Sequence, residues 1–200
     1  MPVGFANSST PVEIRNLWRT PDFAFVPLNN EFRFALDVAA DAMNAKVPDN
    51  FITAEENALT VSWADRIPAG KPLTAWCNPP YDNIQPWLDK AHFEASTRGL
   101  TTVCFVPLTP DAGWWPTNAS EIRQITGVRR KGDARNISGR VKFIRADTGK
   151  PVNGQNKGSC YIIFAPFTLG NMTTKYVPIT QLIDDFETFQ DMTDCGVYDA

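Results

Sequence analysis

The chain contains the stretch Leu73-Thr74-Ala75-Trp76-Cys77-Asn78-Pro79-Pro80-Tyr81, in which an apolar run meets two prolines and a tyrosine. The apolar run predicts a buried strand. The prolines end this strand abruptly, because neither has an N–H to donate and each restricts the residue before it. Asn78 and the carbonyl of Pro79 are therefore held at the carboxyl end of a strand, where open α/β sheets bind their ligands.

This strand end presents two hydrogen-bond acceptors, the Asn78 side-chain oxygen and the Pro79 carbonyl, beside the flat ring of Tyr81. The arrangement suits an exocyclic amine on a planar base, because its two hydrogens bond the acceptors while the base stacks on the ring. Such bonding polarises the amine and frees its lone pair to attack an electrophile. The structural alternative is a Pro-Pro turn that ends a strand beside a packing tyrosine.

The composition is that of a folded globular domain. The 200 residues match one domain of ordinary size, and 43% hydrophobic with 20% charged residues excludes a disordered chain. No apolar run is long enough to span a bilayer. The first ten residues lack the basic start and apolar core of a signal peptide, so we expect a cytoplasmic protein.

The cysteines and the histidine argue against metal or histidine-based chemistry. The four cysteines include no Cys-x-x-Cys pair, and Cys77, Cys104 and Cys160 lie inside apolar runs. We interpret them as buried free thiols in a reducing compartment, rather than as disulfides or metal ligands. The single histidine, His92, falls in the helix expected after the proline motif. It leaves too little for a zinc site or a histidine-based triad, so no metal site is predicted.

The net charge of −3 hides two oppositely charged segments. Residues 129–150 contain eight basic side chains and two acidic ones, whereas residues 168–200 contain six acidic side chains and one basic one. Such segregation is more informative than the total charge. The basic segment favours nucleic acid over protein as the partner. The acidic segment is expected to be a solvated end, with a DNA-mimicking role as the alternative.

Periodicity and turn residues predict strands that alternate with short helices. Thr20 as N-cap and Pro21 at the first helical position begin a helix that Pro27 is expected to break. The other predicted helices cover residues 39–46 and 86–95. The predicted strands cover residues 33–38, 51–53, 59–63, 73–77, 101–106, 140–144 and 160–164. The last two form a closing hairpin, and the whole pattern predicts a mixed sheet in an α/β sandwich.

The chain divides into three parts, without a linker or an internal repeat. Residues 1–17 are expected to form a flexible arm. Residues 18–167 form the folded domain, and residues 168–200 form the acidic C-terminal segment.

Three patches follow one another in the order Thr20-Pro21, Phe34-Ala35-Leu36-Asp37-Val38-Ala39-Ala40 and Trp76-Cys77-Asn78-Pro79-Pro80-Tyr81, with Glu55-Glu56-Asn57-Ala58-Leu59 and Trp63 between the last two. This ordered combination resembles the small phage-type DNA N6-adenine methyltransferases of the Dam kind, over about residues 18–166. The Asn-Pro-Pro-Tyr motif alone is less specific, since methyltransferases that act on proteins and RNA share it. The resemblance implies an α/β fold of the Rossmann-like class I methyltransferase type, with a mixed, mostly parallel sheet, helices on both faces and a C-terminal antiparallel hairpin.

The resemblance also implies a cofactor, S-adenosylmethionine, whose methionine part would lie against backbone amides after the first strand. The residues carried over for this site are Thr20, Pro21, Asp37, Val38, Ala39 and Ala40, together with Asn78. The Val-Ala-Ala turn departs from the glycine-rich turn of many methyltransferases. Since alanine does not readily adopt a positive φ, the backbone path must differ from the glycine-rich form.

An acidic or polar side chain beyond the second strand is expected to hold the ribose hydroxyls. The candidates are Asp41, Asn44, Glu55 and Glu56. The structural alternatives are that Asp41 is a solvated helix residue and that Glu55 and Glu56 form a turn.

The DNA-recognition region must follow the proline motif, because only about forty residues separate Asp37 from Asn78. The candidate insert is residues 109–139, which lack a clear period and join two tryptophans to a basic cluster. Basic side chains attract phosphates and arginine reads guanine edges, while aromatic rings fill the space that a flipped base leaves. The predicted DNA-binding residues are Trp114, Trp115, Arg129, Arg130, Lys131 and Arg135. The alternative is a solvated basic loop beside two core tryptophans.

Together these features predict transfer of the S-adenosylmethionine methyl group to adenine N6 in duplex DNA. The flipped base would bond Asn78 and the Pro79 carbonyl, next to Pro80, and stack on Tyr81. Direct attack on the sulfonium methyl needs no covalent enzyme intermediate, so catalysis is mainly positioning and amine polarisation. Two alternatives stay open: the same chemistry on cytosine N4, RNA adenine or a protein glutamine, and a degenerate member that binds DNA without methylating it.

Overall fold

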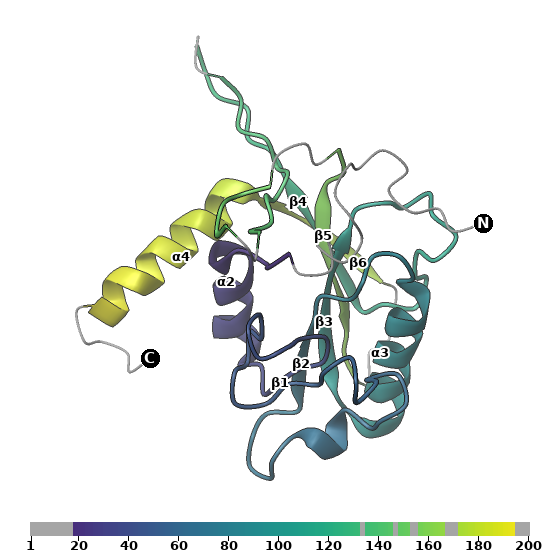
Figure 1. Ribbon diagram of the computed structural model, residues 1–200. Coiled ribbons are helices and arrows are strands. Elements are labelled where there is room, and N and C mark those ends of the chain that lie inside the picture. Colours follow the sequence, from purple (N-terminus) through teal and green to yellow (C-terminus); the bar gives the residue numbers. More distant parts are fainter. Residues whose placement is uncertain (1–17, 133–134, 146–147, 153–155, 167–171, 195–200) are drawn as a thin grey trace.

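A single mixed sheet organises the chain in the computed structural model (Figure 1). The structure describes residues 18–132, 135–145, 148–152, 156–166 and 172–194, so the arm predicted over residues 1–17 lies outside the described residues. The strands are β1 (Leu36–Asp37), β2 (Thr74–Cys77), β3 (Thr101–Pro107), β4 (Glu121–Thr126), β5 (Ser159–Phe164) and β6 (Thr173–Pro178). The helices are α2 (Asp22–Phe32), α3 (Gln85–Arg98) and α4 (Ile179–Asp194), with a short 3₁₀ helix, η1 (Ala64–Arg66).

The sheet has the strand order β1-β2-β3-β5-β4-β6. β1, β2 and β3 are parallel neighbours, as are β4 and β6, whereas β5 runs antiparallel to both β3 and β4. All the strands except β5 therefore point the same way, and the expected mixed, mostly parallel sheet is confirmed. The pairing of Leu36 with Ala75 and of Asp37 with Trp76 brings the carboxyl ends of β1 and β2 to one edge of the sheet.

Helices cover both faces of the sheet, as predicted (Figure 1). Alternate residues of β2 and β3 enter two separate core clusters, because successive side chains of a strand point to opposite faces. Ala75 and Cys77 lie in the cluster that contains residues of α3, and Trp76 lies in the cluster that contains residues of α2 and α4. β2, β3 and β5 are almost entirely buried, which explains why continuous apolar runs predict them correctly.

Helices α2 and α3 show which helix boundaries the local sequence signals predict correctly. α3 has Pro86 in its first turn and ends at Gly99, which adopts the left-handed conformation with φ of 74°. α2 has Pro21 rather than Thr20 as its N-cap, and it continues through Pro27, so the expected break at that proline is wrong. Pro27 removes one backbone donor, but α2 buries an apolar face against the sheet and this packing holds the helix together.

Two predicted elements before the proline motif do not form, and their segments contain turns instead. Residues 39–46 were expected to be helical, but the Asp41 carboxylate accepts the N–H groups of Met43 and Asn44 at 2.7 and 3.0 Å. Residues 59–63 form a turn that leads into η1 rather than a strand.

Two other predicted strands are shorter in the structure than in the sequence. The strand expected over residues 33–38 is reduced to β1. The strand expected over residues 51–53 contributes one parallel bridge, between Asp37 and Phe51, on the side of β1 that faces away from β2. The loop that contains Phe51 therefore lies beside the carboxyl end of β1.

The predicted closing hairpin of residues 140–144 with residues 160–164 is wrong. β4 takes the place beside β5, although its sequence contains only two buried apolar side chains and gives no clear period. Ile144 instead forms isolated bridges with Arg19 and Pro151, outside the sheet. The part of the segment around Ile144 therefore lies outside the sheet, beside the residues that lead into α2.

The described part of the acidic segment forms β6 and α4, which the sequence did not predict. β6 is an edge strand whose first four residues are exposed, so it lacks the apolar alternation that marks a strand. α4 packs on the sheet through Ile179 and Leu182. Its acidic residues are exposed, namely Asp184, Asp185, Glu187, Asp191 and Asp194. None of the described helices is long and apolar enough to cross a membrane.

Candidate active site

The four predicted catalytic residues lie together just beyond β2. Asn78 is half-buried, Pro79 is buried and Pro80 is exposed. The Tyr81 hydroxyl lies 3.0 Å from Asn78 Oδ1 and 3.3 Å from the Phe105 carbonyl oxygen, and it donates its hydrogen to these acceptors. An amide oxygen has two lone pairs, so Asn78 Oδ1 keeps one for a further donor. Tyr81 thus orients the Asn78 side chain and leaves it able to accept.

Tyr81 is also held by its ring and by its burial. The half-buried ring packs edge-on against Phe143, with 6.0 Å between the centroids and 78° between the planes. Burial raises the pKa of Tyr81 well above its ordinary value of 10. The phenol therefore stays protonated at neutral pH, and it serves as a hydrogen-bond donor rather than as a base.

Phe143 belongs to a segment that we call the active-site strap, residues 141–145. The strap touches the site at two points. Phe143 contacts Tyr81, while Ile144 exchanges two backbone hydrogen bonds with Arg19, at 2.8 and 2.9 Å. The strap therefore joins the Asn-Pro-Pro-Tyr motif to the chain segment that leads into α2.

Asp37 lies at the end of β1, opposite Trp76, with only 2% of the residue exposed. Its carboxylate accepts the backbone N–H groups of Lys46 and Ala39, at 2.9 and 3.3 Å. Burial raises the pKa of Asp37 to about 6, against the lowering effect of these two hydrogen bonds and of the Lys46 charge. At neutral pH Asp37 is thus a buried anion, which favours a cationic ligand.

Asp37 and Asn78 line one small cavity at the carboxyl ends of β1 and β2. The residues around it are Trp18, Arg19, Thr20, Asp37, Ala39, Asn44, Lys46, Trp76 and Asn78. Its volume is only about 20 Å³, which is room for about one water molecule. Binding of a nucleoside-sized ligand therefore requires the surrounding side chains to move apart. Among the described residues, no three His, Cys, Asp or Glu side chains gather as a metal-binding group.

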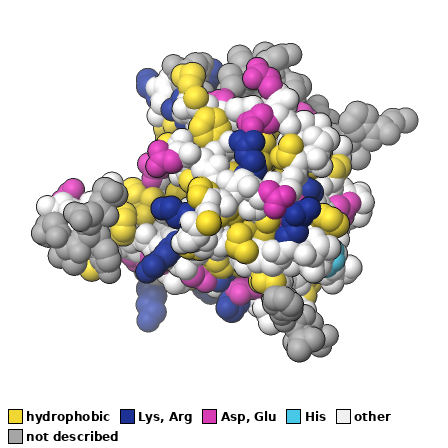
Figure 2. Space-filling model, turned by 90° about the horizontal axis from the view of Figure 1, so that it is seen from below, with side chains coloured by type: hydrophobic (Ala, Val, Ile, Leu, Met, Phe, Trp, Pro, Cys, Tyr) yellow, Lys and Arg dark blue, Asp and Glu magenta, His cyan; other side chains and the backbone are white. Residues whose placement is uncertain are grey.

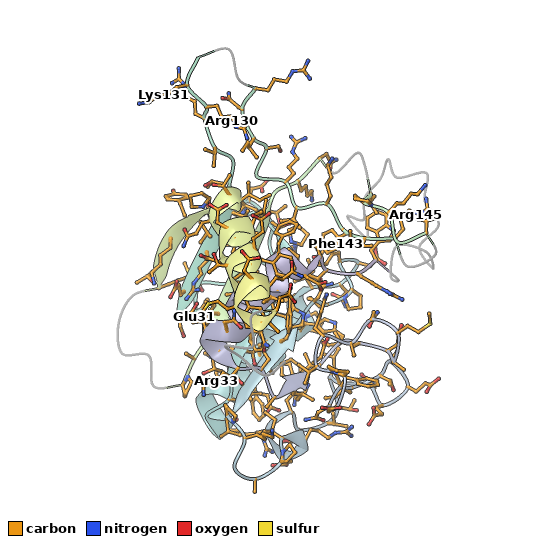
Figure 3. All side chains as sticks on the ribbon, turned by 90° about the vertical axis from the view of Figure 1, so that its left-hand side faces the viewer. Glu31, Arg33, Arg130, Lys131, Phe143 and Arg145 are labelled. Carbon is orange, nitrogen blue, oxygen red and sulfur yellow. The ribbon has the colours of Figure 1, made fainter. Side chains whose placement is uncertain are left out.

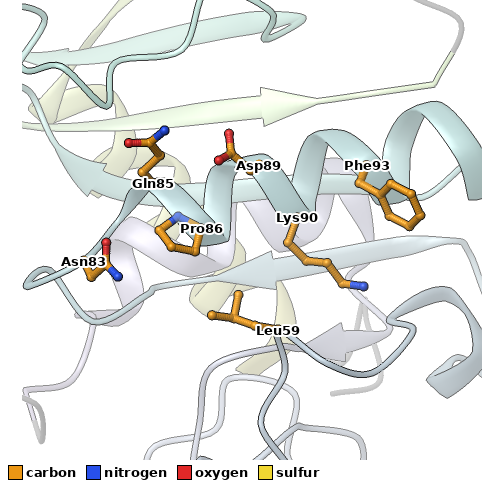
Figure 4. Close-up of a pocket in the computed structure, with 7 residues that line it drawn as sticks. All are labelled: Leu59, Asn83, Gln85, Pro86, Asp89, Lys90 and Phe93. Carbon is orange, nitrogen blue, oxygen red and sulfur yellow. The ribbon is translucent and has the colours of Figure 1, made fainter.

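A larger hollow, of about 530 Å³, lies beside α3 (Figure 4). Its lining residues are Leu59, Asn83, Gln85, Pro86, Asp89, Lys90 and Phe93. None of the predicted catalytic or cofactor-binding residues is among them. Size alone therefore does not identify the active site, and the small cavity at Asp37 and Asn78 is the better candidate because it joins the two motifs.

Comparison with known proteins assigns the chain to a family. The model of the family described as DNA N-6-adenine-methyltransferase (Dam) matches residues 7–188. The chain belongs to this family. The resemblance noted in the sequence is thereby confirmed.

Relatives of this Dam-family chain include two phage proteins, each named DNA N-6-adenine-methyltransferase. The protein of Escherichia phage T1 is 32% identical over 186 residues, covering 89% of this chain and 75% of the relative. The protein of Haemophilus phage HP1 is 30% identical over 181 residues, covering 88% and 94%. A putative methyltransferase of Escherichia coli K12, YfdM, is 42% identical over 76 residues, covering 38% of this chain and 77% of the relative.

Within this Dam-family chain, the cavity brings together only some of the predicted cofactor-binding residues. Those that line it are Thr20, Asp37, Ala39, Asn44 and Asn78. Val38 is buried in the core cluster on the α3 side, and Pro21 caps α2. Asp41 holds the turn before Asn44, since its backbone N–H in turn bonds Asn44 Oδ1 at 2.8 Å.

Glu56, a candidate for the ribose, lies on an exposed turn outside the cavity. Its carboxylate accepts the Thr53 N–H at 3.1 Å and pairs with Arg66 at 2.6 Å, and both interactions lower its pKa. Neighbouring Glu55 is also exposed. The structure therefore favours the turn interpretation for this pair of glutamates.

Sequence reasoning missed four residues that line the cavity: Trp18, Arg19, Lys46 and Trp76. No periodicity or motif marks them as a set. The position of Trp18 and Arg19 directly before Thr20-Pro21 was a usable signal for two of them.

The basic cluster lies on a projecting two-stranded segment that we call the basic arm, residues 127–139, of which 133 and 134 are not described. Figures 1 and 3 show the arm extending away from the sheet. Val128 and Ile137 hold its two sides together by two backbone hydrogen bonds of 2.9 Å. Its exposed basic residues are Arg129, Arg130, Lys131 and Arg135. β4 points the same way as β2, so the arm leaves the sheet at the edge where Asn78 lies.

The structure does not bring Trp114 and Trp115 together with these arginines. Both tryptophans are half-buried and pack against the core cluster on the α3 side, with 5.7 Å between their ring centroids. Ile137, at the base of the arm, packs against the opposite cluster. This packing favours a core role for the two tryptophans.

The three described cysteines are free and buried, as the sequence predicted, and Cys195 lies outside the described residues. Burial raises the pKa of Cys77 and of Cys160 well above the ordinary value of 9.0. Both thiols are therefore neutral at physiological pH and offer no thiolate nucleophile.

Proposed function

We propose that the chain transfers the methyl group of S-adenosylmethionine to the N6 amine of adenine in duplex DNA, the reaction for which its family is named. One observation carries the assignment to these residues. Asn78 lines the cavity that contains Asp37, and its oxygen is oriented by Tyr81 with one lone pair to spare. The acceptor for an incoming amine and the site for a cationic methyl donor thus meet at a single side chain.

The residues around the cavity fit the cofactor. S-adenosylmethionine supplies a methyl group activated on a positively charged sulfur. Asp37 provides a buried anion for a cationic ligand, and the backbone N–H of Ala39 and the side chain of Asn44 add polar groups beside it. Thr20, which is 4% exposed, lines the same cavity. This set supports a binding site for a polar, positively charged group.

The target adenine would leave the DNA stack and enter beside Tyr81, since the reacting amine is otherwise paired within the duplex. Asn78 Oδ1 and the Pro79 carbonyl accept the two N6 hydrogens, and the tyrosine ring supports the base. Accepting both hydrogens raises the electron density on N6 and fixes its direction of attack. Catalysis then consists of positioning and polarisation.

The fold fits a Rossmann-like class I methyltransferase. Adjacent parallel strands end at the proposed cofactor site, as ligand sites of open α/β sheets do. The antiparallel strand β5 inserted between β3 and β4 lets the chain return without a further crossover helix. Two of the relatives are phage proteins, and the corresponding place of action is the cytoplasm of a bacterial host.

The basic arm is the proposed DNA-contacting element. Its four exposed basic residues project from the edge of the sheet that carries Asn78. Figure 2, which shows the molecule from the end opposite the arm, displays acidic and basic side chains interspersed there. Arm residues would attract backbone phosphates and position the duplex over the catalytic motif.

The reaction and its acceptor are tested with purified chain, methyl-labelled S-adenosylmethionine and unmethylated bacterial DNA. We expect N6-methyladenine after digestion, more from duplex than from single-stranded DNA, and none with Asn78→Ala. Asn83→Ala is the matched control, because Asn83 follows the same motif but lines the outer hollow. Methyl transfer only to N4 of cytosine, or only to RNA, would replace the proposed acceptor. Binding of DNA without any transfer would favour the degenerate, non-catalytic member.

A further inference from the structure

Two polar groups at the cavity are buried without a hydrogen-bond partner among the described residues. They are the indole Nε1–H of Trp18 and the Nε–H of Arg19. Both residues line the cavity that contains Asp37. A buried donor that lacks an acceptor destabilises the protein, so two such donors at one cavity point to a ligand with acceptor oxygens.

The placement of these donors is fixed by the fold. The backbone of Arg19 exchanges two hydrogen bonds with Ile144 of the active-site strap, at 2.8 and 2.9 Å. Next along the chain, Thr20 is buried, and Pro21 caps α2. Trp18 and Arg19 therefore belong to a packed wall of the site.

The cavity has charges of both signs. Asp37 provides the anion, while Arg19 and Lys46 are the cations. Lys46 is already engaged, because its Nζ pairs with Asp22 Oδ1 at 2.5 Å and lies 5.7 Å from the centroid of the Phe25 ring. Among the ion pairs of the described residues, none includes Arg19. Arg19 is thus the cation available to an incoming anion.

We propose that Trp18 and Arg19 bind the carboxylate of the methionine part of S-adenosylmethionine, while Asp37 binds its ammonium group. A zwitterionic amino-acid head needs an anionic and a cationic partner a short distance apart, and the two sides of this cavity supply them. Arginine suits a carboxylate because its guanidinium donates in a planar fork, and the indole N–H adds a donor without an acceptor. The inference rests on the proposed function, since it presumes that this cofactor enters this cavity.

The test compares two ligands that differ at one group. S-adenosylhomocysteine has the carboxylate, and its decarboxylated analogue keeps the ammonium group, the thioether and the adenosine. Calorimetry with the full chain is expected to show Arg19→Gln weakening S-adenosylhomocysteine about tenfold to a hundredfold. The same variant should change affinity for the decarboxylated analogue by less than about twofold.

Trp18→Phe is the gentler variant, because it keeps an aromatic ring and removes only the N–H. Its expected effect is a loss of about threefold to tenfold, again confined to the ligand with the carboxylate. Arg98→Gln in the last turn of α3 is the matched control and should leave both affinities unchanged, because Arg98 does not line the cavity.

Several outcomes would overturn the inference. Equal losses for both ligands would mean that Arg19 has a structural role. Unchanged affinity for both ligands, with weaker DNA binding, would make Arg19 a phosphate contact. If the wild-type chain binds neither ligand, the proposed cofactor site fails with it. If wild type binds S-adenosylhomocysteine and both variants bind it equally well, only the carboxylate assignment fails.

Discussion

Asn78 is the residue on which the proposed chemistry depends most directly. Its amide oxygen accepts the Tyr81 hydroxyl and has a second lone pair for the target amine. Asn78→Ala removes that acceptor but no charge. We expect kcat to fall by about a hundredfold to a thousandfold or more, while affinity for S-adenosylhomocysteine stays nearly unchanged. Single-turnover transfer and calorimetry measure the two effects, and full activity of the variant would contradict the mechanism.

Asp37 should give the proposed cofactor site a pH dependence whose sign follows from the pKa of its carboxyl group. In the free protein this pKa is about 6 because of burial, and only the ionised form attracts a cationic ligand. Affinity for S-adenosylhomocysteine should therefore rise by up to about tenfold per pH unit from pH 5 to pH 6 and level off above about pH 7. Asp37→Asn should bind weakly, with a flat profile.

The control for this titration is His92→Gln. His92 packs against Phe164, with 6.1 Å between the rings, and does not line the cavity. The variant should keep the wild-type profile.

For folding stability the pH dependence due to Asp37 has the opposite sign, because the folded state holds the Asp37 proton more tightly than the unfolded chain does. The contribution of Asp37 to stability falls as the pH rises from about 4 to about 6.

At the residue scale, the sequence singled out Asn78 and Asp37 but only some of the other residues that line the cavity between them. Asn78 and Asp37 were predictable because each ends an apolar strand, where the chain must present polar groups. Arg19 was not, because its side chain becomes part of the cavity wall only when its backbone pairs with Ile144, far along the chain. Glu56 is the opposite case. Its charge suggested a role in ribose binding, but its carboxylate pairs with Arg66 and accepts the Thr53 N–H.

At the element scale, the basic arm depends on a close approach of its two sides. A Cβ at Gly139 would collide with the backbone of Thr126 and Gly127, and one at Gly127 would lie 2.5 Å from the Ile137 carbonyl oxygen. Gly139→Ala should therefore displace the arm and weaken duplex binding, measured by fluorescence anisotropy, while binding of S-adenosylhomocysteine is unchanged. Gly113→Ala, which meets no atom within 4 Å, is the matched control. Equal DNA affinity for both variants would contradict the role of the arm.

The charges of the arm make a second prediction. Arg130 and Lys131 lie near its exposed end (Figure 3). If each contacts a phosphate, its replacement by alanine should lower affinity for any duplex and reduce the salt dependence of binding by about one unit of slope. Lys71→Ala removes the same charge before β2, at the opposite edge of the sheet, and should leave the slope unchanged. A change at one base position only would instead mean that the residue reads sequence.

Elements were predictable where burial was complete and unpredictable where it was partial. β2, β3 and β5 are continuous apolar runs, so the sequence located them. β4 and β6 are half-buried or exposed, and they are defined by their partners rather than by their composition. The false hairpin over residues 140–144 arose because Val141 and Phe143 are buried at alternate positions, as in a strand, although the segment forms only isolated bridges.

At the scale of the whole molecule, the basic arm and the small cavity lie at the same edge of the sheet. The basic arm leaves the edge of the sheet that holds the Asn-Pro-Pro-Tyr motif, while the acids of α4 are exposed on a helix that packs against α2. A duplex held by the arm would lie near Asn78, and the strap continues from the arm to Tyr81 and Arg19. One stretch of chain thereby connects the proposed elements for DNA contact, base binding and cofactor binding.

The most direct test of the central claim is the N6-methyladenine content of DNA from a methylation-deficient bacterium that expresses this chain, measured by nucleoside mass spectrometry. The account predicts N6-methyladenine with the wild-type chain and with Asn83→Ala, and none with Asn78→Ala at equal soluble expression. N6-methyladenine at the wild-type level in the Asn78→Ala strain, or its absence from the strain with the wild-type chain, would contradict it.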